Sequence, residues 1–222
     1  MSDHISPNQF HESEGVADWR VLCDGATAFF RTGSLASSAR LVQAISELPD
    51  IDDHFPDIDL RQDGVTVRLL TTTDEYWGMS LRDVEIARQI SAVARRLGLS
   101  ADPMAVQSLL VIPGATDVVA VMPFWRAALG YEPRPDSPEE DLVDPHRRGA
   151  PFWFEEMDEP RPDGGGAIHV AIWVPYEQAE ARVEAALAAG GRMVRDEFAP
   201  SWWTLADAAG NEVDIATTMG RR

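Results

Sequence analysis

Cysteine, long apolar runs and surplus positive charge are all scarce in this sequence of 222 residues. The single cysteine, Cys23, cannot form an internal disulfide, which suits a reducing compartment and excludes metal sites built from clustered cysteines. No apolar run approaches the roughly 18 residues of a membrane span, and the opening residues lack the basic start and apolar middle of a secretory signal. We therefore expect a soluble protein of the cytoplasm that does not bind membranes.

The net charge of -18 restricts the class of partner. Negative charge repels phosphate backbones, and the arginines are scattered among acidic residues and form no stripe. With 45% apolar and 25% charged residues, the chain can bury one large core or two modest ones. We expect a small-molecule substrate and no nucleic acid, and the question of a homo-oligomer stays open.

The first hundred residues alternate strand and helix patterns. Residues 1–17 are polar without hydrophobic periodicity, which predicts a disordered arm. Strand-like segments over 26–33 and 65–73 enclose a helical pattern that begins after Ser34, a plausible N-cap. A second helix begins at Ser80 and ends at Gly98, because Ser80 and Asp83 approximate a capping box. The order of elements predicts an α+β domain over residues 18–99, an antiparallel sheet with helices on one face.

An internal repeat follows SADP, residues 100–103, which we interpret as a linker. Residues 106–113, VQSLLVIP, and 168–175, IHVAIWVP, are both alternating segments that end in proline and lead into an amphipathic helix. The segments FWFEE at 152–156 and NEVDI at 211–215 read as the last strands of the two halves. Repeats this short predict a duplicated unit over residues 104–222 whose copies share a core.

The repeat supplies a candidate metal site. Superposing the two prolines that end the repeated strands places Gln107 on His169, and the last strands bring Glu155 near Asp214. If the halves pair about a pseudo-twofold axis, these four side chains would project into one cup, and such donors suit a divalent first-row metal. The alternative is that they are ordinary polar residues of half-exposed strand faces.

The second half resembles the glyoxalase-like branch of the vicinal oxygen chelate superfamily. PFWRAALGYE, IHVAIWVP and DAAGNEVDIAT, within roughly residues 104–218, are similar to that branch's strand-helix and final-strand motifs. The resemblance implies a paired βαβββ module forming a cup that often holds a metal. Gln107, His169 and Asp214 match its ligand places, and Glu155 does so less closely. The family usually has glutamate as its final acid and often histidine as its first ligand.

The first half, over roughly residues 19–98, resembles pterin-4a-carbinolamine dehydratase. DDHFPDIDL is similar to that family's His-His-Pro segment, VTVRLLTTT to the following strand and SLRDVEIARQI to the opening of the terminal helix. These enzymes remove water from a 4a-hydroxytetrahydropterin. The reaction needs a base at N5 and an acid at the departing C4a hydroxyl, roles that imidazole suits because its pKa lies near the working pH.

The family's histidines carry over only in part. His54 matches the first histidine and Pro56 the proline, but Phe55 occupies the place of the second histidine. His54 could act as a proton-transfer group, or it could be a capping or solvent-facing histidine in an Asp-rich turn. Both interpretations stay open.

The third family histidine follows the strand, and this chain offers none there. The candidates are Thr72, Thr73 or Asp74, depending on where two loop residues are inserted. Asp74 could act as a base in its place, and Trp77 could stack on a flat pterin ring.

Three readings of function follow. The first is a hydro-lyase with His54 and Asp74 as catalytic residues and Phe55, Pro56 and Trp77 at the substrate, which requires no cofactor. The second treats the dehydratase-like domain as a binding or dimerisation module beside a metal-dependent glyoxalase-like domain. The third is a protein that binds small molecules in both domains without turnover.

Overall fold

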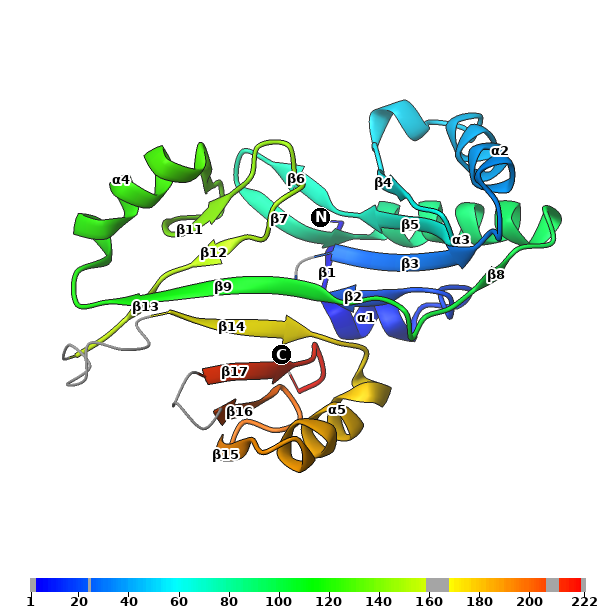
Figure 1. Ribbon diagram of the computed structural model, residues 1–222. Helices are drawn as coiled ribbons and strands as arrows, with labels where there is room; N and C mark the ends of the chain where they lie inside the picture. Colours follow the sequence, from blue (N-terminus) through cyan, green and yellow to red (C-terminus); the bar gives the residue numbers. More distant parts are fainter. Residues whose placement is uncertain (1–2, 24, 159–167, 207–211, 221–222) are drawn as a thin grey trace. The chain divides into compact units, whose positions relative to one another are not determined.

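The computed structural model describes residues 3–23, 25–158, 168–206 and 212–220 (Figure 1). The chain separates into two compact units, unit 1 over Met1–Val106 and unit 2 over Gln107–Arg221. Both units combine helices with mainly antiparallel strands, so the predicted α+β class is confirmed. Within the described ranges, no helix has the length and apolar character needed to cross a membrane.

Unit 1 contains two sheets and three helices among its described residues. The larger sheet has the order β2-β3-β5-β4, with β8 beside β3, and the smaller has the order β1-β7-β6; all pairs are antiparallel. The strands are β1 (His4–Ile5), β2 (Arg20–Leu22), β3 (Gly25–Arg31), β4 (Asp57–Leu60), β5 (Gly64–Leu69), β6 (Thr71–Thr73), β7 (Tyr76–Ser80) and β8 (Ser100–Ala101). The helices are α1 (Pro7–Glu12), α2 (Leu35–Ser46) and α3 (Leu81–Arg96), with a 3-10 turn, η1, at Ile51–Asp53.

The core of unit 1 lies between the larger sheet and its helices. Alternate residues of β3 and β5 point to the helices because successive strand side chains face opposite sides. The buried residues from these two strands are Ala26, Ala28, Phe30, Val65, Val67 and Leu69. They form one cluster with Phe10 of α1, Leu41 and Ile45 of α2, and Val84, Ala87 and Ile90 of α3. All three helices therefore pack on one face of the sheet, as the sequence predicts.

Both ends of α3 follow the predicted signals. Ser80 is the N-cap, and it forms a capping box with Asp83, which accepts a hydrogen bond from the Ser80 backbone N–H at 2.7 Å. After the helix, Gly98 has a positive φ of 71°, a conformation that glycine adopts without steric penalty. This helix presents its first turn, with Asp83, to the rest of unit 1.

The predicted disordered arm at residues 1–17 is corrected by the structure. Residues His4 and Ile5 pair with β7, and α1 begins at a capping box between Ser6 and Gln9. Phe10 is fully buried in the core of unit 1. A single aromatic residue anchors a helix too short to produce a hydrophobic period, which explains why the sequence pattern did not reveal it.

The predicted linker at residues 100–103 is also corrected. Ser100 and Ala101 form β8 against β3. The backbone N–H of Asp102 donates to the carbonyl of Phe29 at 2.8 Å, and the Asp102 carboxylate accepts from Arg31 Nε at 3.1 Å. This segment therefore completes the edge of unit 1, and the division between the units falls between residues 106 and 107.

Unit 2 contains one nine-stranded sheet in the order β10-β11-β12-β9-β14-β17-β16-β15, with β13 also beside β9. The first half comprises β9 (Ser108–Ala115), α4 (Val118–Leu129), β10 (Glu132–Arg134), β11 (Ser137–Val143), β12 (Phe152–Trp153) and β13 (Glu155–Glu156). The second comprises β14 (Ile168–Trp173), α5 (Tyr176–Ala188), β15 (Arg192–Arg195), β16 (Trp202–Ala206) and β17 (Glu212–Ala216). The order of elements repeats, which confirms the paired βαβββ architecture.

The two halves of unit 2 join where β9 pairs antiparallel with β14 (Figure 1). In each half the last strand returns parallel to the first, β12 and β13 beside β9 and β17 beside β14. One face of each half packs against its own helix: Val111 and Phe152 against α4, and Ile172 and Ile215 against α5. The opposite face of the sheet is where ligand-binding side chains would have to project.

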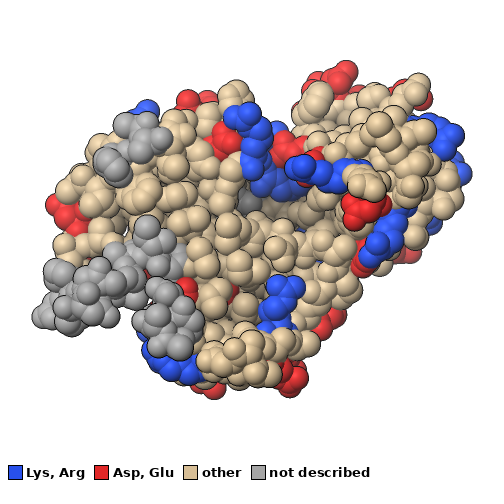
Figure 2. All heavy atoms as spheres, in the orientation of Figure 1, with Lys and Arg blue, Asp and Glu red and all other residues tan. Residues whose placement is uncertain are grey.

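Charged side chains of both signs mix on the surface. Figure 2 shows arginine and acidic side chains side by side on the visible face. Several form ion pairs, including Arg68 with Asp57 at 2.8 Å and Arg134 with Asp136 at 2.7 Å. Exposed pairs of this kind contribute little to stability, typically about 0–1 kcal/mol each.

Candidate functional site

His54 lies at the end of η1 and faces the first turn of α3. Its Nε2 is 2.6 Å from Oδ1 of Asp83. The His54 side chain is 12% exposed, whereas the Asp83 side chain is fully buried. The two residues are 29 positions apart in sequence, so the fold, and not local chain geometry, brings them together. His54 is therefore held in a fixed orientation while part of its ring still reaches the surface.

Asp83 is the centre of a small polar network. Its Oδ2 accepts hydrogen bonds from the Ser80 backbone N–H at 2.7 Å, from Ser80 Oγ at 3.0 Å and from Thr71 Oγ1 at 2.7 Å. A buried carboxylate is tolerated when its oxygens are satisfied in this way. Residues from β6, β7 and the η1 turn thus converge on one residue of α3.

The network assigns different tasks to the two ring nitrogens of His54. An ionised carboxylate can only accept hydrogen bonds, so with Asp83 ionised Nε2 of His54 is the donor in their contact. The lone pair of the neutral ring then lies on Nδ1. Nδ1 is the atom through which this histidine could accept a proton, and Asp83 would stabilise the imidazolium that forms.

The other residues singled out in this region occupy varied positions. Phe55 is exposed, with 68% of its surface accessible, and Pro56 is buried. Asp74 lies exposed in the turn between β6 and β7, and Trp77 lies half-buried in β7 opposite Thr72. The carboxylate that faces His54 is that of Asp83, and Asp74 is at the hairpin turn.

The sequence identified Asp83 only as part of a capping box. Its second role, as the partner of His54, leaves no periodic signal because the contact joins a loop to a distant helix. Thr71 lies in the strand-like segment predicted over residues 65–73, and nothing in that pattern marks it as a partner of Asp83. One feature does point to this role of Asp83. Asp83 is at the N3 position of α3, and a carboxylate buried in the first turn of a helix needs several hydrogen-bond donors.

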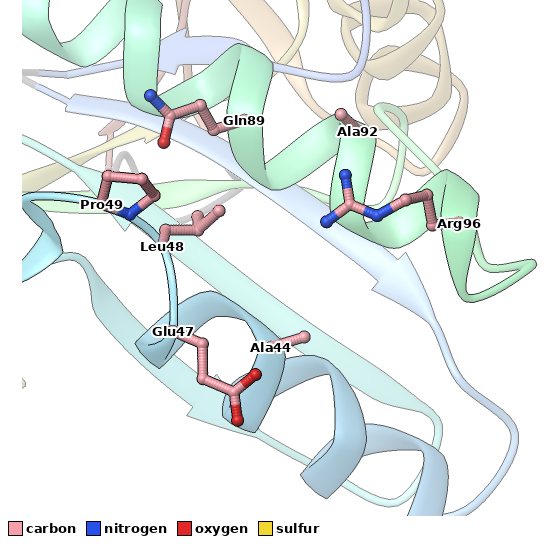
Figure 3. Close-up of a pocket in the computed structure, with 7 residues that line it drawn as sticks. All are labelled: Ala44, Glu47, Leu48, Pro49, Gln89, Ala92 and Arg96. Carbon is pink, nitrogen blue, oxygen red and sulfur yellow. The ribbon is translucent and has the colours of Figure 1, made fainter.

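A separate groove in unit 1 lies between the end of α2 and α3 and has a volume of about 490 Å³ (Figure 3). Its lining residues are Ala44, Glu47, Leu48, Pro49, Gln89, Ala92 and Arg96. Gln89 donates to Glu85 through its amide nitrogen at 3.2 Å, while its Oε1 is buried without a hydrogen-bond partner among the described residues. No lining residue belongs to the His54 network, so the groove is distinct from the candidate site.

In unit 2, two of the four predicted metal donors, Asp214 and Glu155, lie on the sheet face away from the helices. Asp214 of β17 lies on the face opposite α5 and accepts a hydrogen bond from Thr204 Oγ1 at 2.6 Å. Glu155 pairs with Gly114 on the face opposite α4. Gln107 is exposed and directly precedes β9. His169 lies in β14 opposite Ile112, and its side chain is outside the described part of the structure.

The four-residue metal site stays a prediction, because the side chain of His169 lies outside the described residues. Among the residues whose placement the structure gives, no group of three or more His, Cys, Asp or Glu side chains is arranged to hold an ion. The superposition that equates Gln107 with His169 requires the correct register, since a shift of one residue moves a strand side chain to the other face of the sheet. No chemical step in unit 2 is assigned to a metal.

Two further acids of unit 2 differ in electrostatics. Hydrogen bonds from backbone N–H groups, above all that of His146, lower the pKa of Asp144, although burial opposes this. Burial raises the pKa of Asp141, against the influence of Arg134. Asp141 pairs with Trp153 across β11 and β12, on the face opposite α4.

Comparison with known proteins identifies the family that unit 1 matches. A family model described as pterin 4 alpha carbinolamine dehydratase matches residues 4–93, which include His54 and Asp83. A protein of Nocardia farcinica (strain IFM 10152) named "putative pterin-4-alpha-carbinolamine dehydratase" is 32% identical over 82 residues, 37% of this chain and 84% of that protein. The chain belongs to the pterin-4-alpha-carbinolamine dehydratase family. A protein of Aquifex aeolicus (strain VF5) with the same name is 28% identical over 86 residues, 39% of this chain and 85% of that protein.

Unit 2 matches a different family model. This model, described as a glyoxalase-like domain, matches residues 110–216. The crystal structure of a glyoxalase/bleomycin resistance protein/dioxygenase superfamily member from Vibrio splendidus 12B01 covers 50% of this chain and 99% of its own, with 14% identity and a TM-score of 0.34. The two resemblances that the sequence indicates, dehydratase-like and glyoxalase-like, are both confirmed.

Proposed function

We propose that unit 1 is a hydro-lyase that removes water from a 4a-hydroxytetrahydropterin, with His54 as its proton carrier. The observation that carries the proposal is the contact of His54 Nε2 with the buried carboxylate of Asp83, 2.6 Å away, inside the region matched by the dehydratase family model. A histidine whose ring is oriented by a carboxylate at one nitrogen can accept a proton at the other, which is what a general base requires.

The reaction needs two proton movements. Nδ1 of His54 accepts the proton from N5 of the pterin, the C4a–N5 double bond forms, and the C4a–O bond breaks. The departing hydroxyl group takes a proton and leaves as water, and the imidazolium of His54 can supply that proton. The positive charge on the His54 imidazolium is balanced by the Asp83 carboxylate. No redox cofactor is required, because no electrons are exchanged with another molecule.

The substrate would lie against the exposed ring of Phe55. Phe55 directly follows His54, and its side chain is 68% exposed, which leaves an aromatic face open to a flat bicyclic ring. Pro56, which is buried, fixes the backbone behind it. Trp77 offers a second aromatic surface from β7, and Asp74 at the hairpin turn would assist proton transfer from its exposed position.

The direct test is the rate of dehydration of a 4a-hydroxytetrahydropterin by the full chain and by His54→Ala. Loss of a general acid–base group lowers the rate by roughly 10²- to 10⁴-fold. His146→Ala, which removes an exposed histidine of unit 2, is the matched control and should retain the wild-type rate. The proposal fails if wild type and His54→Ala both proceed at the uncatalysed rate.

A second candidate function places ligand binding in unit 2, with unit 1 as a binding or dimerisation module. It is favoured by the face of the sheet away from α4 and α5, on which Asp214, Glu155 and the partly exposed Trp153 lie. The test is metal analysis of protein purified without chelator, with thermal unfolding in the presence of added divalent ions. Stabilisation of the protein by an ion supports the metal-dependent form. Metal-free protein that gains no stability speaks against it.

A further inference from the structure

The loop that carries His54 is attached to α3 at two neighbouring residues. Asp83 contacts the His54 ring at one end of the loop. At the other end, Nη2 of Arg82 donates to the backbone carbonyl of Asp50 at 2.8 Å. The two attachment points on the loop, Asp50 and His54, bracket the single turn η1 (Ile51–Asp53). Adjacent residues of one helix therefore hold both ends of the turn that presents the imidazole.

Asp50 is a point at which the loop needs support. Its φ of 56° and ψ of 18° lie in the left-handed region, which aspartate adopts more readily than most residues but which still costs more than the right-handed region. The Asp50 carbonyl also accepts the backbone N–H of Asp53 at 3.2 Å, and the backbone N–H of His54 donates to Ile51 at 3.1 Å. The Arg82 contact thus acts on the same carbonyl that closes the turn before His54.

A third contact fixes the start of the turn. Ile51 is 6% exposed and belongs to the buried cluster of unit 1. Packing of the Ile51 side chain holds the turn against the core but still allows the turn to rotate. Such a rotation would change the distance between the His54 ring and Asp83. The guanidinium of Arg82 opposes that rotation, since it binds a backbone oxygen whose direction is fixed by the left-handed Asp50.

We propose that Arg82 is a positioning residue for His54. By holding the Asp50 carbonyl, it keeps the imidazole within hydrogen-bond distance of Asp83. The catalytic consequence rests on the proposed function of unit 1, but the positioning itself does not. Both Arg82 and Asp50 are exposed, so their contact stabilises the turn less than a buried hydrogen bond to a charged group would. Its loss should loosen the turn without unfolding unit 1.

The same helix provides a matched control. Arg88 of α3 also donates to a distant backbone carbonyl, from Nε to Glu14 at 2.6 Å, and that carbonyl lies in the segment after α1. Arg88→Ala therefore removes a similar contact elsewhere on α3. Arg82→Lys keeps the positive charge and one donor but loses the planar guanidinium, so it should restore part of the effect.

The first measurement is amide hydrogen exchange at Asp53 and His54 in the full chain. Arg82→Ala should accelerate exchange at these two amides by roughly two- to fivefold, Arg82→Lys by less, and Arg88→Ala should leave them unchanged. The second measurement is the nitrogen NMR signal of the His54 ring, which should move toward that of a mixture of tautomers in Arg82→Ala alone. Exchange and ring signals equal to those of Arg88→Ala would overturn the proposal.

Kinetics provide the third measurement. If unit 1 dehydrates the pterin, Arg82→Ala should lower kcat by roughly two- to tenfold with KM nearly unchanged, because the variant misplaces the proton carrier and removes no substrate contact. A KM effect with unchanged kcat would overturn the positioning role. An inactive wild type would refute the proposed function alone, since the exchange and NMR results would still decide whether Arg82 positions His54.

Discussion

Unit 1 and unit 2 each contain an aspartate whose carboxylate accepts several hydrogen bonds, but the donors differ. Asp83 binds the backbone and hydroxyl of Ser80, the hydroxyl of Thr71 and the ring of His54. Asp144 accepts hydrogen bonds from backbone N–H groups of its own loop, from His146 at 2.8 Å, Gly149 at 2.9 Å and Arg148 at 3.0 Å, and it forms an ion pair with the Arg148 side chain at 3.7 Å. A carboxylate with several hydrogen-bond donors therefore points to an acid–base site when one of the donors is a group such as histidine, which can exchange a proton through a second atom.

The same contrast separates the candidate sites of the two units. In unit 1 the carboxylate is buried and the histidine above it is partly accessible, so the polar network ends at the surface. In unit 2, Asp214 is engaged by the neighbouring hydroxyl of Thr204, which has no acid–base role near neutral pH. Among the described residues, a histidine in contact with a buried carboxylate is therefore a feature of unit 1.

The largest expected effect comes from removing the centre of the unit 1 network. Asp83→Ala would leave four donors without their acceptor, among them a buried backbone N–H, and should destabilise unit 1 by about 3 kcal/mol. Amide exchange of the buried α3 residues Ala87 and Ile90 reports the free energy of opening of this unit.

Asp59→Ala is the control for that substitution. Asp59 forms an exposed pair with Arg61 at 2.8 Å, and its loss should change stability by less than about 0.5 kcal/mol. If Asp83→Ala proves no more destabilising than Asp59→Ala, Asp83 is not the organising residue of the network.

Local rules predicted much of this fold from the sequence. The period of α3 and the spacing of Ser80 and Asp83 locate a helix and its first turn, because both signals arise within a few residues. The repeat in unit 2 was visible because the same order of strand and helix recurs. The partner of His54 was not predictable, since it depends on how η1 packs against α3, and neither period nor spacing encodes that contact.

The superposition that equates Gln107 with His169 depends on the register between the two repeated strands. Aligning the two strands by their prolines matched residues of equal parity, whereas the structure places the odd-numbered Val111 of β9 and the even-numbered Ile172 of β14 toward the helices. Strand side chains alternate, so the register between repeats must be known to within one residue before ligands can be assigned. Sequence similarity between short strands does not provide that register.

An intermediate effect is expected from Asp144. Its lowered pKa means that the ionised form is favoured in the folded state, so its contribution is present above the ordinary value of 3.8 and is lost as the pH falls through the folded-state pKa. Asp144→Asn should therefore destabilise unit 2 at pH 7, and the difference from wild type should shrink in acid.

Thermal unfolding of both proteins across the acid range measures this dependence, and amide exchange in β14 assigns it to unit 2. The shape of the curve is informative because an asparagine keeps the size of the side chain and one acceptor oxygen but removes the charge. A difference that is constant with pH would show that the loop depends on the shape of Asp144 and not on its charge.

The smallest effect is expected from Asp141, and it has the opposite sign. Burial raises the pKa of this carboxyl, so ionisation is penalised in the folded state above the raised pKa, and the penalty is relieved as the pH falls through it. Asp141→Asn should slightly stabilise unit 2 at neutral pH, since Arg134 retains Asp136 as a partner at 2.7 Å. The gain should disappear in acid, where the wild-type carboxyl is protonated. If Asp141→Asn instead destabilises unit 2 at pH 7, the contact with Arg134 at 3.6 Å outweighs the cost of burial, and the two acids would stabilise the unit in the same way.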